Sequence, residues 1–142
     1  MLSSFETTWS PRLLSVLRIV AGLLFLQHGS QKLLGLPFPP ANGLPAMGTI
    51  FWWGGIIELV GGILVMIGLF TRPVAFVLSG QMAVAYWMFH APRGLFPLST
   101  NGNQGELAIV YCFVFLFIAV AGAGIWSIDA ALKRQGRLPA WV

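Results

Sequence analysis

Residues 50–70 read IFWWGGIIELVGGILVMIGLF, an apolar run in which Glu58 is the one charged side chain. A run of this length meets the roughly 20 residues that an α-helix needs to cross the hydrocarbon core of a bilayer. Three further apolar runs have a similar length: residues 13–34, 73–90 and 106–126. The sequence therefore predicts an all-α integral membrane protein, a bundle of four transmembrane helices.

The composition agrees with lipid as the solvent of most side chains. Of the 142 residues, 57% are hydrophobic and 8% charged, whereas a typical soluble domain carries about 25% charged residues. The formal charge of +4 comes from 8 basic and 4 acidic residues, too few cations for a face that follows nucleic-acid phosphates. Cys112 is the only cysteine, so the chain alone has no CxxC pair, disulfide or cysteine-based metal site. We expect no nucleic-acid partner, no metal and no encoded cofactor.

The connecting segments predict how a single domain over residues 1–142 is threaded through the membrane. The N-terminus lacks the basic region of a cleaved signal peptide, so the first apolar run should remain as an anchor. An even number of spans puts both termini on one side. The basic residues on or near span ends at that side are Arg12, Arg18, Arg72, Lys133, Arg134 and Arg137, against Lys32 and Arg93 at the other. By the positive-inside rule we expect cytoplasmic termini and a cytoplasmic tail at 127–142.

Two of the apolar runs carry charges on a face that also carries glycine. In the first run, a 4-3-4-3 spacing puts Arg18, Gly29 and Lys32 on one side of a helix. In the second run, Glu58 and Gly61 share a face in the same way. Small residues let membrane helices approach closely, so both faces should point into the bundle.

Depth and side-chain direction favour an ion pair between Lys32 and Glu58. At about 1.5 Å per residue, Lys32 lies about 3 Å and Glu58 about 12 Å from the outer ends of their helices. Helical side chains lean toward their own N-terminus, so these two lean toward each other. An unpaired charge at mid-membrane costs at least about 2.5–3.5 kcal/mol. For Arg18, snorkelling into the headgroups is favoured over a link to Glu58.

Polar side chains at a similar depth predict a pocket in the outer half of the bilayer. His28 at about 9 Å and Gln81 at about 14 Å share a layer with Glu58. An intramembrane carboxylate marks ligand binding or proton handling by default, although a buried pair can be architectural. The candidate ligand-binding residues are His28, Lys32, Glu58, Gln81 and Glu106, and the candidate ion-pair or structural residues are Arg18, Lys32 and Glu58. No catalytic residue is assigned.

Several of these polar or aromatic residues have a purely structural alternative. His28 can be a hydrogen-bonded interfacial histidine, and Glu106 can serve only the dipole of the helix that it opens. His90, at the end of its run, is interpreted as hydrogen-bonded. Tyr111 and Phe115 lie one turn apart and are interpreted as packing rather than as a stacking platform.

Three stretches together have the pattern of a known family. They are RIVAGLLFLQHGSQKLLG (18–35), GGIIELVGGILVMIGLFTRPVA (54–75) and NGNQGELAIVYCFVFLFIAVAGAGIWSIDAAL (101–132). This set resembles the DoxX family of small bacterial four-helix membrane proteins, and the resemblance implies a multi-pass protein of the bacterial inner membrane. The residues that fall on the polar positions of the family are Arg18, His28, Lys32, Glu58 and Glu106.

The resemblance implies a membrane component of a redox system. Relatives are described as the membrane component of a thiosulfate:quinone oxidoreductase, or as a membrane partner that gathers a superoxide dismutase and a sulfurtransferase. We therefore expect a membrane subunit of a quinone-linked oxidoreductase system that receives electrons from partner oxidoreductase subunits or from a bound cofactor. His28, Lys32 or Gln81 could donate hydrogen bonds to a quinone headgroup. Glu58 could then handle a proton.

Two other functions stay open, and with them whether the chain is part of an enzyme. A non-enzymatic scaffold would recruit soluble partners, for which the short tail 127–142 is nearly the whole cytoplasmic surface. Transport of a small solute or lipid would need a homo-oligomer, because four helices show no inverted repeat or broken helix.

Overall fold

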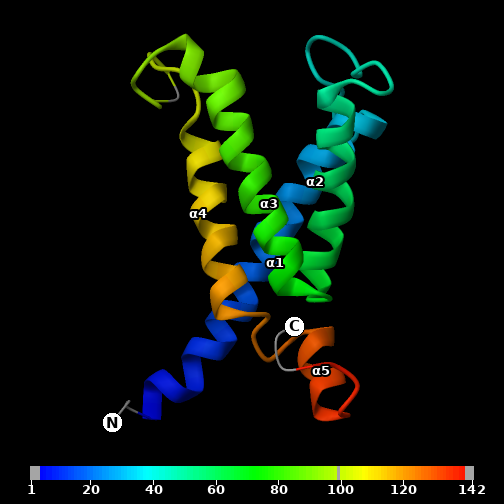
Figure 1. Ribbon diagram of the computed structural model, residues 1–142, viewed down its shortest axis with the longest axis vertical. Coiled ribbons are helices and arrows are strands. Elements are labelled where there is room, and N and C mark those ends of the chain that lie inside the picture. Colours follow the sequence, from blue (N-terminus) through cyan, green and yellow to red (C-terminus); the bar gives the residue numbers. More distant parts are fainter. Residues whose placement is uncertain (1–3, 99, 140–142) are drawn as a thin grey trace.

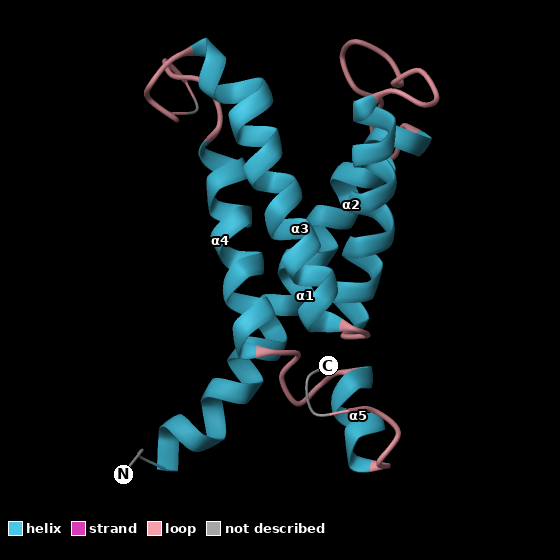
Figure 2. Ribbon diagram, viewed as in Figure 1, coloured by secondary structure: helices cyan, strands magenta, loops and turns pink. Residues whose placement is uncertain are grey.

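The computed structural model describes residues 4–98 and 100–139, and within these ranges every regular element is helical (Figure 2). The α-helices are α1 (Ser4–Leu34), α2 (Ile50–Ile67), α3 (Thr71–Ala85), α4 (Glu106–Ala121) and α5 (Ile128–Arg134). A π-helical turn, η1 (Tyr86–His90), and a 3-10 turn, η2 (Ala91–Arg93), extend α3. By length and composition, α1, α2 and the segment Thr71–Arg93 can each cross a membrane, and α4 is a shorter apolar helix.

The first helix begins earlier than its apolar run. α1 starts at Ser4 rather than at residue 13, so its first turns are polar. Local hydrogen bonds support these turns: the hydroxyl of Thr7 donates to the Ser4 carbonyl, and the guanidinium of Arg12 donates to the Thr8 carbonyl. Hydropathy identifies only the part of a helix that lies in lipid. A polar extension of the same helix is therefore not predicted from it.

Two helices end earlier than their apolar runs. α2 stops at Ile67 because Gly68 takes a left-handed conformation, with φ of 72°, and its N–H bonds to the Leu64 and Val65 carbonyls. α4 stops at Ala121, before Gly122 with φ of 96°. The ranges 50–70 and 106–126 were therefore too long. Glycine at a positive φ ends a helix even where the sequence remains apolar.

The four longer helices form two antiparallel pairs. Contacts are far more extensive between α1 and α2 and between α3 and α4 than between the pairs. In Figure 1 the pairs converge near α5 and diverge toward the connections at residues 35–49 and 94–105. We call these two ends of the bundle the α5 end and the loop end.

The glycine face predicted for α1 lies at its contact with α2, whereas Gly61 on the predicted face of α2 packs against Leu78 of α3. A Cβ atom on Gly22 would lie 2.6 Å from the Met66 nitrogen, and one on Gly62 would lie 2.6 Å from the Leu26 nitrogen. Gly29 meets the backbone of Leu59 in the same way. The backbones therefore touch directly, and the prediction that these faces point into the protein is confirmed.

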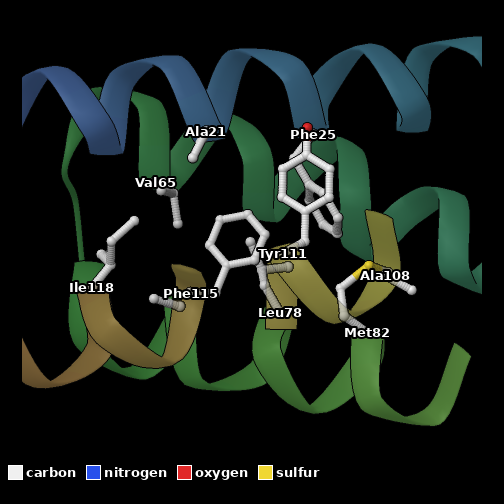
Figure 3. Close-up of a cluster of buried hydrophobic side chains, with 10 residues drawn as sticks. Ala21, Phe25, Val65, Leu78, Met82, Ala108, Tyr111, Phe115 and Ile118 are labelled. Atoms are coloured by element: carbon white, nitrogen blue, oxygen red, sulfur yellow. The ribbon is translucent and has the colours of Figure 1, made fainter. Parts of the chain in front are cut away.

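Aromatic and branched side chains fill the junction between the two pairs (Figure 3). The rings of Phe25 and Phe115 meet edge to face, with centroids 4.8 Å apart. Tyr111 stacks on Phe115 at 5.7 Å, and Phe115 is fully buried, so the packing interpretation is confirmed for Phe115. Many apolar side chains on the outside of the bundle are exposed, among them Phe76 and Phe113, which suits lipid as the surrounding solvent.

Arg18 holds the α5 end together. Its side chain is fully buried and donates to the carbonyls of Val65 and Met66 in the last turn of α2. It also donates to the carbonyls of Ala123 and Trp126, between α4 and α5. The snorkelling interpretation was wrong, and so was the link to Glu58. Carbonyls at a helix end lack intrahelical donors, and five guanidinium N–H groups can satisfy several of them at once.

Asp129 makes a second connection at the α5 end. Its two carboxylate oxygens accept hydrogen bonds from the backbone nitrogens of Phe70 and Thr71, each at 2.8 Å. These nitrogens belong to the N-terminus of α3, where unpaired N–H groups and the helix dipole favour a carboxylate. The two helix pairs are thus joined at the α5 end. They diverge toward the loop end, and the pocket lies between them there (Figure 1).

Candidate functional site

A pocket of about 650 Å³ lies between the helix pairs at the loop end. This volume is in the range of about 300–1,000 Å³ that is usual for small-molecule sites. Most of its wall is apolar, with side chains such as Phe25, Ile57 and Met82. Its polar lining residues are His28, Lys32, Glu58, Gln81, His90, Arg93 and Gln104. Four of the five candidate ligand-binding residues from the sequence therefore line one pocket.

The expected ion pair is present in the wall of this pocket. Lys32 Nζ lies 2.6 Å from Glu58 Oε1. The Glu58 side chain is 3% exposed and the Lys32 side chain 31% exposed. The carboxylate is therefore the buried member of the pair, and the ammonium lies on the open side of it.

Gln81 brings α3 into the same cluster. Its Nε2 donates to Glu58 Oε1 at 3.2 Å and to the Gly54 carbonyl at 3.1 Å. Because Lys32 comes from α1 and Glu58 from α2, the cluster connects three helices. The helix positions follow from the glycine contact between α1 and α2, which brings their charged faces together.

Two acceptor atoms in this cluster have no partner. Glu58 Oε2 and Gln81 Oε1 are buried and make no hydrogen bond within the described part of the chain. An unsatisfied buried acceptor costs about 1–3 kcal/mol. Both atoms lack a donor, and neighbouring atoms cover them, so a side chain of the cluster must rotate before an O–H or N–H group of a ligand can reach them.

His28, one turn before Lys32 on α1, supplies a polar ring that can donate or accept a hydrogen bond in the same pocket. Its ring meets Tyr111 edge to face, with centroids 6.2 Å apart. No other residue in 4–98 or 100–139 forms a hydrogen bond with it, which leaves both ring nitrogens available. The described residues therefore give the His28 ring no hydrogen-bond partner that would support the alternative of a hydrogen-bonded interfacial histidine.

The loop after η2 folds back over the pocket around a buried Asn103. Its Nδ2 donates to the Gly94 carbonyl at 3.0 Å, and its Oδ1 accepts from the Gly105 nitrogen at 2.8 Å. His90 Nδ1 lies 3.0 Å from the Asn103 carbonyl oxygen. The hydrogen-bonded interpretation of His90 is therefore confirmed, although its ring also lines the pocket.

The same fold of the loop brings Arg93 and Gln104 to the pocket rim. Gln104 takes a left-handed φ of 59°, next to Asn103. Sequence reasoning missed both residues, because it placed them in a polar loop without a predicted shape. The run NGNQG at 101–105 held the available signal, since Asn beside Gly is typical of turns that cap a helix end.

Two candidate residues lie outside the pocket. Glu106 is exposed at the first residue of α4 and does not line the pocket. Arg18 lies at the α5 end. The described residues include no group of three His, Cys, Asp or Glu side chains that could hold a metal ion.

Comparison with known proteins gives one family match. The model of the family described as DoxX matches residues 13–91. An uncharacterized protein of Haemophilus influenzae is 42% identical over 125 residues, which cover 85% of this chain and 91% of that protein. The inner membrane protein YqjF of Escherichia coli is 27% identical over 124 residues, covering 84% of this chain and 92% of its own length. An uncharacterized membrane protein of Mycobacterium tuberculosis is 30% identical over 132 residues, which cover 84% of this chain and 80% of that protein. No solved structure matches the chain.

Proposed function

The chain belongs to the DoxX family of multi-pass membrane proteins, and from this premise we propose that it is the membrane subunit of a quinone-linked oxidoreductase system. In this proposal α1 to α4 all cross the inner membrane, and both termini lie in the cytoplasm. The loop end then faces outside, and the pocket lies in the outer half of the bilayer. The ring of a quinone occupies the pocket.

The observation that carries the proposal is the mixture of donors and unpaired acceptors in one apolar pocket. An oxidised quinone ring offers two carbonyl acceptors, which suit the ammonium of Lys32 and the ring of His28. A reduced ring offers two hydroxyl donors, which would bond to Glu58 Oε2 and Gln81 Oε1 after these covered side chains rotate toward the pocket. The residues present therefore fit both forms of the ring.

The side chains have distinct roles in this proposal. A bound quinone would supply two-electron, two-proton chemistry. Glu58, held by Lys32 and Gln81, would accept a hydrogen bond from a ring hydroxyl and hold its proton. The apolar wall would exclude water from the ring. Electrons would come from a partner subunit or from a bound cofactor.

Mass spectrometry of small molecules retained by the protein in mild detergent would test the proposal. We expect the wild type to retain a quinone at near one per chain, and Glu58→Gln to retain much less with its fold intact. Glu106→Gln is the matched control, because Glu106 is exposed and outside the pocket. If the wild type retains no quinone and takes up none when it is added, the proposal is wrong.

A non-enzymatic scaffold is the second candidate, and the α5 end favours it. Arg18 and Asp129 are buried charged groups whose hydrogen bonds serve the joining of helices alone. If Glu58 had the same purpose, Glu58→Gln would lower the melting temperature and leave every bound small molecule unchanged. The mass-spectrometric comparison therefore separates the two candidates.

A further inference from the structure

A groove of about 360 Å³ runs along the outside of the bundle between α2 and α3. It is lined only by apolar side chains, proline and glycine. Val60 and Leu64 on α2 face Val74 and Val77 on α3 across it. The groove offers no polar side chain to a ligand, which makes it suitable for hydrocarbon.

The groove adjoins the pocket. Ile57 and Val77 line both of them. From Ile57 the groove follows α2 to Leu64, which is about 10 Å along the helix axis at 1.5 Å per residue. The pocket holds every polar group of this combined site, and the groove extends it away from the loop end.

The backbone of Gly61, which has no side chain, forms the bottom of the groove. The side chain of Leu78, which is fully buried, packs over the backbone of Gly61. Val60 and Val77 stand on either side and are exposed at the surface. The groove is therefore open to lipid along its length, and a chain could enter it sideways.

We propose that pocket and groove together bind an amphiphile with one apolar chain, the quinone ring lying in the pocket and its isoprenoid tail in the groove between α2 and α3. This inference rests on the proposed function. The two sites meet at Ile57 and Val77, so a ligand whose polar and apolar parts are joined would fill both of them.

A phospholipid fits the same site less well. Glu58 lies about 12 Å along α2 from the loop end, which is too deep for a charged phosphate. At the depth of Glu58, the ammonium of Lys32 already bonds to that carboxylate, and the guanidinium of Arg93 lies at the rim. A neutral ring has no such penalty at that depth.

Photochemical labelling in lipid nanodiscs would test the inference. Two benzoquinones with a prenyl-like tail carry a diazirine, one beside the ring and the other at the middle of the tail. We expect the ring probe to label pocket residues. The tail probe should label residues 56–64 and 73–78, and excess unlabelled tailed quinone should suppress both signals.

A pair of variants gives a second measurement. Val60 lines only the groove and is 50% exposed, while Val110 on α4 is 51% exposed and lines neither site. Val60→Trp should reduce the affinity advantage of a tailed quinone over the tail-less ring by about tenfold, as expected when on the order of ten carbon contacts are lost. It should leave the affinity of the tail-less ring unchanged. Val110→Trp should change neither affinity.

The outcomes separate this inference from the proposed function. If the ring probe labels the pocket but the tail probe labels outward-facing residues no differently from a phospholipid carrying the same diazirine, the groove is ordinary lipid-facing surface and the inference is wrong. If the ring probe gives no labelling that unlabelled quinone suppresses, the proposed function fails and the inference falls with it.

Discussion

Lys32 on α1 and Glu58 on α2 form an ion pair in which the two partners are buried to very different degrees. Their charged atoms lie 2.6 Å apart, but Glu58 is 3% exposed and Lys32 is 31% exposed. Glu58 therefore depends on Lys32 for its charge balance, whereas Lys32 can reach a more polar layer without Glu58. Because of this asymmetry, we expect substitutions of Lys32 and of Glu58 to change the free energy of unfolding by different amounts.

Loss of the lysine should be more harmful than loss of the carboxylate. Removing one member of a buried pair costs about 3–5 kcal/mol because it leaves an uncompensated charge. We expect Lys32→Met to lower the free energy of unfolding by about 3 kcal/mol, and Glu58→Gln to lower it by less. The double variant should recover part of the loss. Equilibrium unfolding in mixed micelles would give all three values, and a Glu58→Gln variant as unstable as Lys32→Met would contradict the asymmetry.

Arg18 should not tolerate lysine. Its planar guanidinium donates to four carbonyls that come from α2 and from the segment between α4 and α5. An ammonium has three donors on one atom and cannot match this spread. We expect Arg18→Lys to destabilise the protein by about 2 kcal/mol or more, since each unsatisfied buried group costs about 1–3 kcal/mol.

The control for this prediction is Arg134→Lys. Arg134 is exposed in the last turn of α5, where either cation suits the helix C-terminus. Thermal unfolding of the two variants in the same detergent is the measurement. Equal melting temperatures would mean that the buried guanidinium contributes nothing to joining the helices.

The contact between α1 and α2 should reject even one methyl group. A Cβ on Gly62 would lie 2.6 Å from the Leu26 nitrogen, which belongs to backbone and cannot move aside alone. We expect Gly62→Ala to destabilise the protein by about 1–3 kcal/mol through overpacking. Because the charged faces of α1 and α2 would separate, quinone retention should fall as well.

Gly80 provides the matched control for glycine substitution. It lies within α3, and a Cβ placed on it would meet nothing within 4 Å. Alanine in a helix interior is favoured over glycine by about 0.5–1 kcal/mol. Gly80→Ala should therefore be neutral or stabilising in the same unfolding assay. A destabilisation equal to that of Gly62→Ala would show that helix contact is not the cause.

The unpaired acceptors predict that the pocket prefers the reduced ring. Glu58 Oε2 and Gln81 Oε1 can accept hydrogen bonds from hydroxyls but gain nothing from carbonyls. We expect the hydroquinone to bind more tightly than the quinone. A tenfold preference would raise the reduction potential of the bound couple by about 30 mV. Redox titration of the bound quinone against the same quinone in empty nanodiscs would measure it.

The variant Glu58→Gln tests whether the Glu58 carboxylate causes this preference for the reduced ring. The amide replaces one acceptor with a donor, so the ratio of the two affinities should shift toward the quinone. The exposed Glu106 serves again as the control position. A ratio that stays the same in Glu58→Gln and in wild type would remove the carboxylate from ring recognition.

The sequence by itself determined the helices and the charged faces of α1 and α2. Both follow from local sequence patterns. The length of an apolar run indicates a helix in lipid, and a spacing of three and four residues places side chains on one side of that helix. Lys32 and Glu58 could be paired in advance for the same reason, since their depths and side-chain directions depend only on positions within their own helices. Most of the pocket wall around Glu58 followed from these two helices and Gln81.

Only the tertiary structure decided the partners of Arg18 and the shape of the pocket rim. The Arg18 guanidinium meets the Ala123 carbonyl across 105 positions of the chain, and no local pattern encodes which unpaired carbonyls a turn at residues 122–127 will present. Asn103 likewise shapes a loop that brings Arg93 and Gln104 to the pocket. Hydrogen bonds between distant segments form wherever packing brings a donor to an unsatisfied acceptor, so they depend on the assembled helices and not on the residues that flank them.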